Sequence, residues 1–277
     1  MFVSKIKDNN TRRFFGDACT ITSMREQAQF ETIQGKRVFT VFSEPDDGSK
    51  TIVIMCHGFK GSTVGAARSF VTFTRLLVEN EISVLRFDQP CSGNSEGDFS
   101  DSSFTGWVDT VSHFVTMYIN LGYKVALLGH SMGATTALVA ATCPELSTKI
   151  PLLILWAPDP KSNKDEWFLQ DAKLIDEKTQ LFEEGGLQFH AKFWQEVLDA
   201  DFFECLQQYQ GKIHLVYGES DKFVSAELKN RVIQAVTEKN QTVLVLEGQD
   251  HMLWEHDSCK KVFAAELALI RQTFALK

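Results

Sequence analysis

Residues 124–134 read Lys-Val-Ala-Leu-Leu-Gly-His-Ser-Met-Gly-Ala, and this stretch decides the fold. The continuous apolar run predicts a strand over 124–128 that is buried on both faces of a parallel sheet. The small residues that follow predict a helix over 131–141. The pattern G-x-S-x-G between the two is typical of a sharp strand-to-helix turn that exposes a serine hydroxyl. Ser131 is therefore predicted to be a nucleophile.

Short apolar runs alternate with longer helical patterns along most of the chain, which is typical of a mostly parallel sheet with helices on both faces. Strands are predicted over residues 37–43, 51–56, 82–87, 124–128, 150–157, 213–217 and 242–246. Helices are predicted over 67–79, 105–121, 131–141 and 225–239, with one more at the C-terminus. The alternation stops between 159 and 210, where the sequence is charged, aromatic and without a strand pattern. We therefore predict a core of residues 1–158 and 211–277 with a helical cap insertion over 159–210.

Three further segments carry a resemblance to a known family. His57-Gly58-Phe59 follows an early strand, Asp88 precedes a Ser- and Gly-rich loop over 92–97, and two turns end in Asp221 and His251. With the G-x-S-x-G motif, these segments make the chain resemble the α/β-hydrolase superfamily over nearly its whole length. Within it, the chain is most similar to small bacterial carboxylesterases of the cinnamoyl or feruloyl esterase type. The resemblance implies an α/β-hydrolase fold, with a mostly parallel central sheet and a helical cap insertion.

A serine needs a neighbouring base to act as a nucleophile, and in this fold the base is a histidine late in the chain. His251 follows the last predicted strand, in a turn that Gly248 opens. His256 comes five residues later, where the last helix is predicted to begin. His251 is therefore the predicted base.

The orienting acid of such a triad lies between the serine and the histidine in the sequence. Asp221 follows the strand over 213–217 and matches the family's acid turn, while Asp159 and Glu219 are the alternatives. The predicted triad is Ser131, Asp221 and His251.

The oxyanion of an acyl-transfer intermediate needs backbone donors, for which the family rule implies the N–H groups of Phe59 and Met132. Aromatic side chains of the insertion are candidates to line a substrate pocket, although aromatic residues at helical spacing more often belong to the core. The candidates are Trp167, Phe182, Phe189 and Trp194.

Composition excludes several other classes of function. A net charge of -8 and an isoelectric point near 5.4 disfavour nucleic-acid binding. No apolar run is long enough to insert into a membrane, so a cytoplasmic location is expected. The spacing of cysteines and histidines predicts no metal site, and the expected chemistry requires no cofactor.

The sequence thus predicts a serine esterase that acts on a small-molecule ester with an apolar or aromatic group, through an acyl-enzyme. The same triad would serve a thioesterase, an amidase or peptidase, or an acyltransferase, because substrate identity lies in the pocket. A non-catalytic binding module on the same fold is the alternative from another class. A homodimer is compatible with the sequence, which does not determine the oligomeric state.

Overall fold

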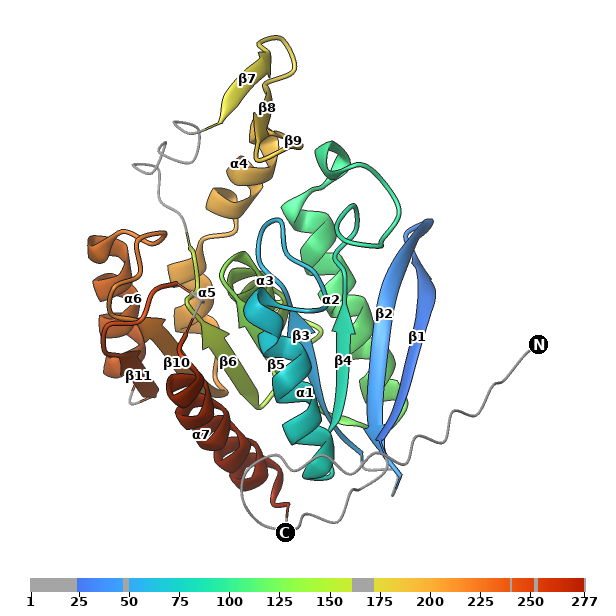
Figure 1. The fold of residues 1–277 in the computed structure, drawn as a ribbon, viewed down its shortest axis with the longest axis vertical. Coiled ribbons are helices and arrows are strands. Elements are labelled where there is room, and N and C mark those ends of the chain that lie inside the picture. The colour runs from blue at the N-terminus through green and yellow to red at the C-terminus, as the bar shows by residue number, and fades with distance from the viewer. Residues whose placement is uncertain (1–23, 47–49, 161–171, 240, 252–253, 277) are drawn as a thin grey trace, which may run out of the picture.

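The computed structural model describes residues 24–46, 50–160, 172–239, 241–251 and 254–276. Its centre is an eight-stranded sheet with the order β1-β2-β4-β3-β5-β6-β10-β11 (Figure 1). The strands are β1 (Met24–Ile33), β2 (Lys36–Pro45), β3 (Thr51–Cys56), β4 (Ser83–Phe87), β5 (Lys124–His130), β6 (Leu152–Trp156), β10 (Lys212–Gly218) and β11 (Thr242–Leu246). The six strands from β4 to β11 in this order run parallel, while β1 and β2 pair antiparallel at one edge.

Helices cover both faces of the sheet, because successive side chains of a buried strand point to opposite faces. Ile52 and Ile54 of β3 join one core cluster, and Val53 and Met55 join the other. One face packs against α1 (Ser69–Glu79) and α7 (His256–Phe274), and the other against α2 (Phe104–Asn120), α3 (Met132–Thr142) and α6 (Ala226–Glu238). None of the described helices is both long and apolar enough to span a membrane. The predicted mostly parallel sheet between two helical layers is confirmed.

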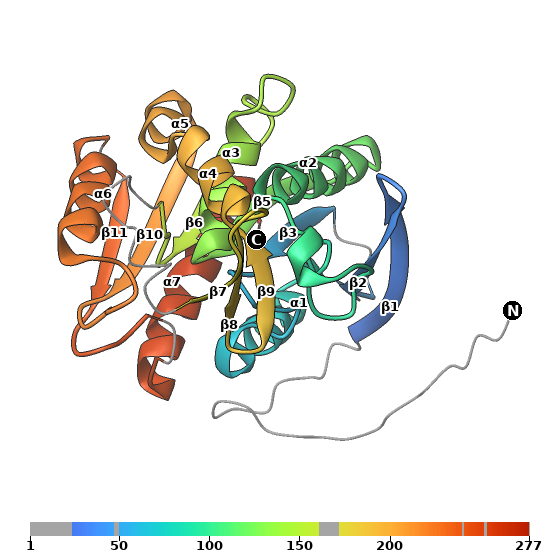
Figure 2. The same cartoon turned by 90° about the horizontal axis from the view of Figure 1, so that it is seen from above.

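The insertion between β6 and β10 lies above the sheet, and Figure 2 shows it across the top of the core. It contains β7 (Lys173–Asp176), β8 (Leu181–Glu184) and β9 (Leu187–His190), which form a three-stranded antiparallel sheet. The helices α4 (Ala191–Asp199) and α5 (Phe202–Gln208) follow. The prediction that this segment lacks strands was therefore wrong. Gly185 and Gly186, at φ 59° and 83°, form the hairpin turn between β8 and β9, and a Gly-Gly pair between short apolar runs is its sequence signal.

A buried carboxylic acid lies on the face of the sheet that packs against α1 and α7. Glu266 of α7 is fully buried, accepts a hydrogen bond from the Trp156 indole N–H, and lies 3.5 Å from Nδ1 of His214. Burial raises the pKa of Glu266, since a carboxylate is poorly solvated there, while contacts with His214 and Trp156 oppose this rise. The folded protein therefore holds this proton more tightly than the unfolded chain does.

We expect the variant Glu266→Gln to gain stability relative to the wild type as the pH rises from about 5 to about 8. A pKa raised by folding contributes stability that is complete below the usual glutamate pKa and is lost as the pH rises through the folded-state value. The amide has no proton to lose and still accepts from the Trp156 indole. Thermal denaturation of both proteins across this range checks the prediction, and parallel curves would contradict it.

Candidate active site

Ser131 occupies a strained turn between β5 and α3. Its backbone angles are φ 55° and ψ −125°, a conformation that side-chain-bearing residues rarely adopt. Its N–H donates to the carbonyl of Trp156 at 2.8 Å, and its carbonyl accepts from the N–H of Ala134 at 2.9 Å. These bonds hold the turn in the shape that projects a nucleophile from the edge of a sheet.

Two glycines make this turn sterically allowed. A Cβ on Gly133 would overlap the carbonyl oxygens of Cys56 and His57, and a Cβ on Gly129 would overlap the backbone of Gly133 and Ala134. At both positions the atoms that the Cβ would meet belong to the main chain of buried segments, which cannot rotate away as a side chain can. The G-x-S-x-G spacing therefore reflects the close approach of β3, β5 and α3.

We expect Gly133→Ala to destabilise the protein by about 3 kcal/mol or more, since the new methyl group must push two buried segments apart. Gly35→Ala is a matched control: Gly35 has φ 81° but open space around its Cβ position, so only backbone strain of about 1 kcal/mol is expected. Denaturant titration of both variants measures the difference. Equal losses at the two positions would contradict the steric argument.

The predicted acid and base are in contact. Nδ1 of His251 lies 2.8 Å from Oδ2 of Asp221, a residue that is 7% exposed. The other carboxylate oxygen of Asp221 accepts from the N–H groups of Phe223 and Val224, at 2.9 and 3.2 Å. The carboxylate is thereby fixed in orientation, and the contact assigns the imidazole proton to Nδ1 and leaves Nε2 as an acceptor.

The alternative acids have other surroundings. Glu219 accepts a hydrogen bond from the N–H of Gly248, so it ties the turn after β10 to the turn after β11. Asp159 lines the cavity described below, and its backbone carbonyl accepts from the hydroxyl of Thr135. Neither has a hydrogen bond to His251 in the described part of the chain, so Asp221 is the acid that orients this imidazole.

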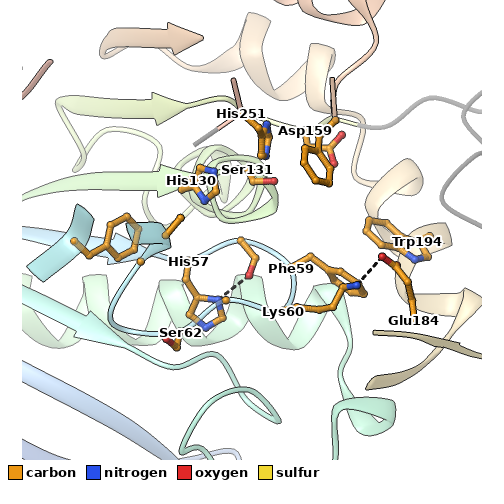
Figure 3. Close-up of a pocket in the computed structure, with 16 residues that line it drawn as sticks. His57, Phe59, Lys60, Ser62, His130, Ser131, Asp159, Glu184, Trp194 and His251 are labelled. Atoms are coloured by element: carbon orange, nitrogen blue, oxygen red, sulfur yellow. Dashed lines mark hydrogen bonds and ion pairs between the residues drawn. The ribbon is translucent and has the colours of Figure 1, made fainter. Parts of the chain in front are cut away.

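Ser131 and His251 line the same cavity, and Figure 3 shows their side chains next to one another. Among the described residues no hydrogen bond joins the two side chains. Such bonds are often long in an unliganded enzyme and tighten when substrate binds. The fold thus places three groups next to one another in the order hydroxyl of Ser131, imidazole of His251 and carboxylate of Asp221, and we refer to them as a row.

Two further histidines lie near this row, and both are held neutral. Burial lowers the pKa of His130 well below its usual value, and its ring centroid is 5.1 Å from that of His251. Burial also lowers the pKa of His57, which accepts from the N–H of Gln89 at Nε2 and therefore donates from Nδ1 to the carbonyl of Gly58. His57 braces the loop after β3, and neither imidazole adds positive charge beside His251.

Residues of the loop after β3 line the cavity, and α3 begins directly after Ser131, which also lines it. The N–H groups of Phe59 and Met132 have no hydrogen-bond partner among the described residues. Met132 is the first residue of α3, where the aligned peptide dipoles favour a negative charge. The described chain therefore leaves both predicted donors without a protein acceptor.

The cavity has a volume of about 460 Å³. Its wall consists of His57, Gly58, Phe59, Lys60, Gly61, Ser62, Gly65, Ala66, Phe70, His130, Ser131, Asp159, Glu184, Trp194, Phe223 and His251. This wall joins core loops to residues of the insertion. It is mainly apolar, and Lys60 and Glu184 form an ion pair within it. Within the described ranges, no three His, Cys, Asp or Glu side chains gather as a metal site requires.

The insertion aromatics differ in where they lie. Trp194 is in the cavity wall, but Phe182 and Phe189 are not: they are buried behind it in the core cluster, with their rings stacked. Their positions on paired strands β8 and β9 turn them inward. Trp167 lies outside the described residues.

Sequence reasoning missed Phe223, Lys60 and Glu184. Phe223 is 60% exposed, and its ring centroid is 5.1 Å from that of His251 at the cavity mouth. An apolar residue two positions after the predicted acid was the available signal for Phe223. Lys60 directly follows the predicted oxyanion residue, whereas Glu184 in the insertion had no comparable signal.

Known proteins share this architecture. A family model described as serine aminopeptidase, S33, matches residues 47–184. A search of curated proteins found no match. Est1E from Butyrivibrio proteoclasticus, solved with ferulic acid bound, superposes with a TM-score of 0.75 at 20% identity, over 90% of this chain and 100% of that chain.

Two other solved structures are similar over as much of the chain. DcsB in complex with a substrate analogue has a TM-score of 0.70 at 17% identity, over 90% of this chain and 100% of that chain. The thioesterase domain from the curacin biosynthetic pathway has a TM-score of 0.60 at 16% identity, over 90% and 99%. Similarity at these identities concerns the fold.

Proposed function

Because this chain is an α/β-hydrolase by fold, we propose that it is a serine hydrolase that cleaves carboxylic esters through Ser131, His251 and Asp221. The observation that carries the proposal is the 2.8 Å contact of Asp221 with His251, which lines one cavity together with the strained Ser131. A structural ion pair alone would not need a serine in a rare backbone conformation beside it.

The reaction would begin with the imidazole. Nε2 of His251 takes the Ser131 proton as the hydroxyl oxygen attacks the ester carbonyl, and Asp221 stabilises the imidazolium that forms. The N–H groups of Phe59 and Met132 would bind the oxyanion of the tetrahedral intermediate. His251 then gives its proton to the leaving alcohol, and an acyl-enzyme remains. A water molecule activated by the same imidazole releases the acid.

The cavity supports a substrate with an apolar or aromatic group. Four aromatic side chains contribute to its wall: Phe59, Phe70, Trp194 and Phe223. Apolar walls exclude water and favour burial of an acyl or alcohol group of matching shape. The ferulic acid bound in Est1E, whose fold this chain shares, supports the same substrate class.

A second candidate is thioester hydrolysis with the same residues, which the fold shared with the thioesterase domain favours. The two functions differ in the leaving group and not in the triad. Matched oxygen and sulfur esters of one aromatic acid would separate them by their kcat/KM values.

The proposed function is tested by labelling with a fluorophosphonate, which forms a covalent bond to an activated serine. We expect the wild type to be labelled at Ser131 and to hydrolyse aryl or aromatic esters without added metal. A folded wild-type protein that neither reacts with the probe nor turns over any ester would overturn the proposal and favour a binding module.

A further inference from the structure

The insertion contacts the side chain of Phe59, a residue that lines the candidate site and whose N–H is a proposed oxyanion donor. The Phe59 ring has four aromatic neighbours: Phe99 at 4.9 Å between centroids, Phe189 at 5.4 Å, Phe193 at 5.4 Å and Trp194 at 4.6 Å. Three of these four come from β9 and α4 of the insertion. The Phe59 side chain thus belongs to the insertion's aromatic cluster, although its backbone belongs to the core.

The next residue is tied to the insertion by charge. Nζ of Lys60 lies 2.7 Å from Oε1 of Glu184, the last residue of β8, and Figure 3 shows the pair across the cavity wall. The side chains are 27% and 37% exposed, so water and salt weaken the pair without abolishing it. Lys60 also has a left-handed backbone with φ 58°, which external contacts must hold.

The core side of this loop is fixed independently. His57 bonds to the carbonyl of Gly58 and to the N–H of Gln89, and the N–H of Gly61 donates to the carbonyl of Gly58 at 2.9 Å. These contacts brace the residues that flank Phe59. The Gly58 carbonyl and the Phe59 N–H belong to one peptide plane, so these contacts set the plane of that donor within the loop. The side chains of Phe59 and Lys60 tie the same loop to the insertion.

We propose that Lys60 and Glu184 are positioning residues that, with the Phe59 ring, hold the loop after β3, and with it the Phe59 N–H, at the place that oxyanion binding requires. This inference rests on the proposed function. A donor must lie where the oxyanion forms, and small displacements in such sites reduce rates strongly. The insertion therefore acts on the chemical step as well as on substrate selection.

In a competing interpretation, the ion pair is part of the cavity wall and only contacts the substrate. The two interpretations predict different results for an ester with a short acyl group. The acetyl group of p-nitrophenyl acetate is too short to fill a cavity of about 460 Å³. Loss of a substrate contact would raise KM for larger esters, whereas a displaced oxyanion donor would lower kcat for every ester.

The test compares Glu184→Gln and Lys60→Met with the wild type on p-nitrophenyl acetate. Each change leaves a partly exposed side chain of similar size, so folding should be retained. We expect kcat to fall about three- to fivefold, with KM nearly unchanged, because a partly exposed ion pair contributes little more. The rate of fluorophosphonate labelling should fall by the same factor.

Lys192→Met is the matched control, because Lys192 is another lysine of the insertion, 82% exposed, and among the described residues it pairs with Glu196 of the same helix. Its kcat should equal that of the wild type. The double variant with exchanged charges, Lys60→Glu with Glu184→Lys, should recover most of the lost kcat. High salt should slow the wild type more than Glu184→Gln.

Unchanged kcat in both single variants would overturn the inference, as would a change confined to KM of large esters. Failure of the charge exchange to restore kcat, with a folded protein, would also count against it. These outcomes are distinct from failure of the proposed function, in which the wild type itself would not be labelled or active.

Discussion

Replacing Ser131 by alanine is expected to lower kcat by about 10⁴- to 10⁶-fold and to abolish fluorophosphonate labelling. The change removes only the hydroxyl oxygen, and the described structure gives that oxygen no hydrogen bond, so the fold should remain. The residual rate would come from the oxyanion donors and from binding. Ester turnover measures the loss in kcat, intact mass after probe treatment measures the labelling, and a thermal melt shows whether the fold is retained.

Ser62→Ala is the control for this result, because Ser62 lines the same cavity but lies in the loop after β3. Its activity should stay within a few-fold of the wild type. Labelling that persists in Ser131→Ala and disappears in Ser62→Ala would move the nucleophile to the other wall.

Replacing His251 by alanine is the second large effect, with an expected loss in kcat of about 10⁴-fold or more near neutral pH. Among the described side chains, His251 is the base that Asp221 orients, so its removal leaves Ser131 without the proposed proton acceptor. The loss should shrink at alkaline pH, where hydroxide removes the proton without help. A pH–rate profile of kcat/KM for both proteins measures this.

His256→Ala is the matched control, since His256 is exposed at the start of α7 and only five residues away. It should keep nearly full activity. Asp221→Asn should cost about 10⁴-fold, because the amide favours the wrong imidazole tautomer, while Asp159→Asn should cost far less. The reverse order at these two positions would contradict the proposed triad.

The sheet was predictable where its strands are buried on both faces. β3 and β11 begin and end where the apolar runs do, and β5 differs from its prediction by two residues. β1 was missed because its sequence is mostly polar and nearly all of it is exposed, so no run or alternation marks it. Backbone hydrogen bonds to β2 hold β1 in the sheet, and these bonds leave no pattern in the side chains of β1.

The candidate site was predictable where chemistry requires particular residue types at fixed places in the topology. Chain order and strand ends indicated Ser131, Asp221 and His251 because loops at the carboxyl ends of parallel strands share one edge. The cavity wall was not predictable in the same way. Phe182 and Phe189 were chosen for their ring type, but pairing of β8 with β9 decides which side chains face inward, and those strands were not anticipated.

The backbone of Ser131 also bears on how this protein would change under selection. Glycine adopts φ 55° and ψ −125° without the conflict that a Cβ introduces there. A library screened for heat tolerance alone would therefore enrich Gly at this position, and under the proposed mechanism those clones would not turn over substrate. Any thermostable variant selected from this chain must be assayed for turnover in every round, because stability and the proposed activity make opposite demands on this one residue.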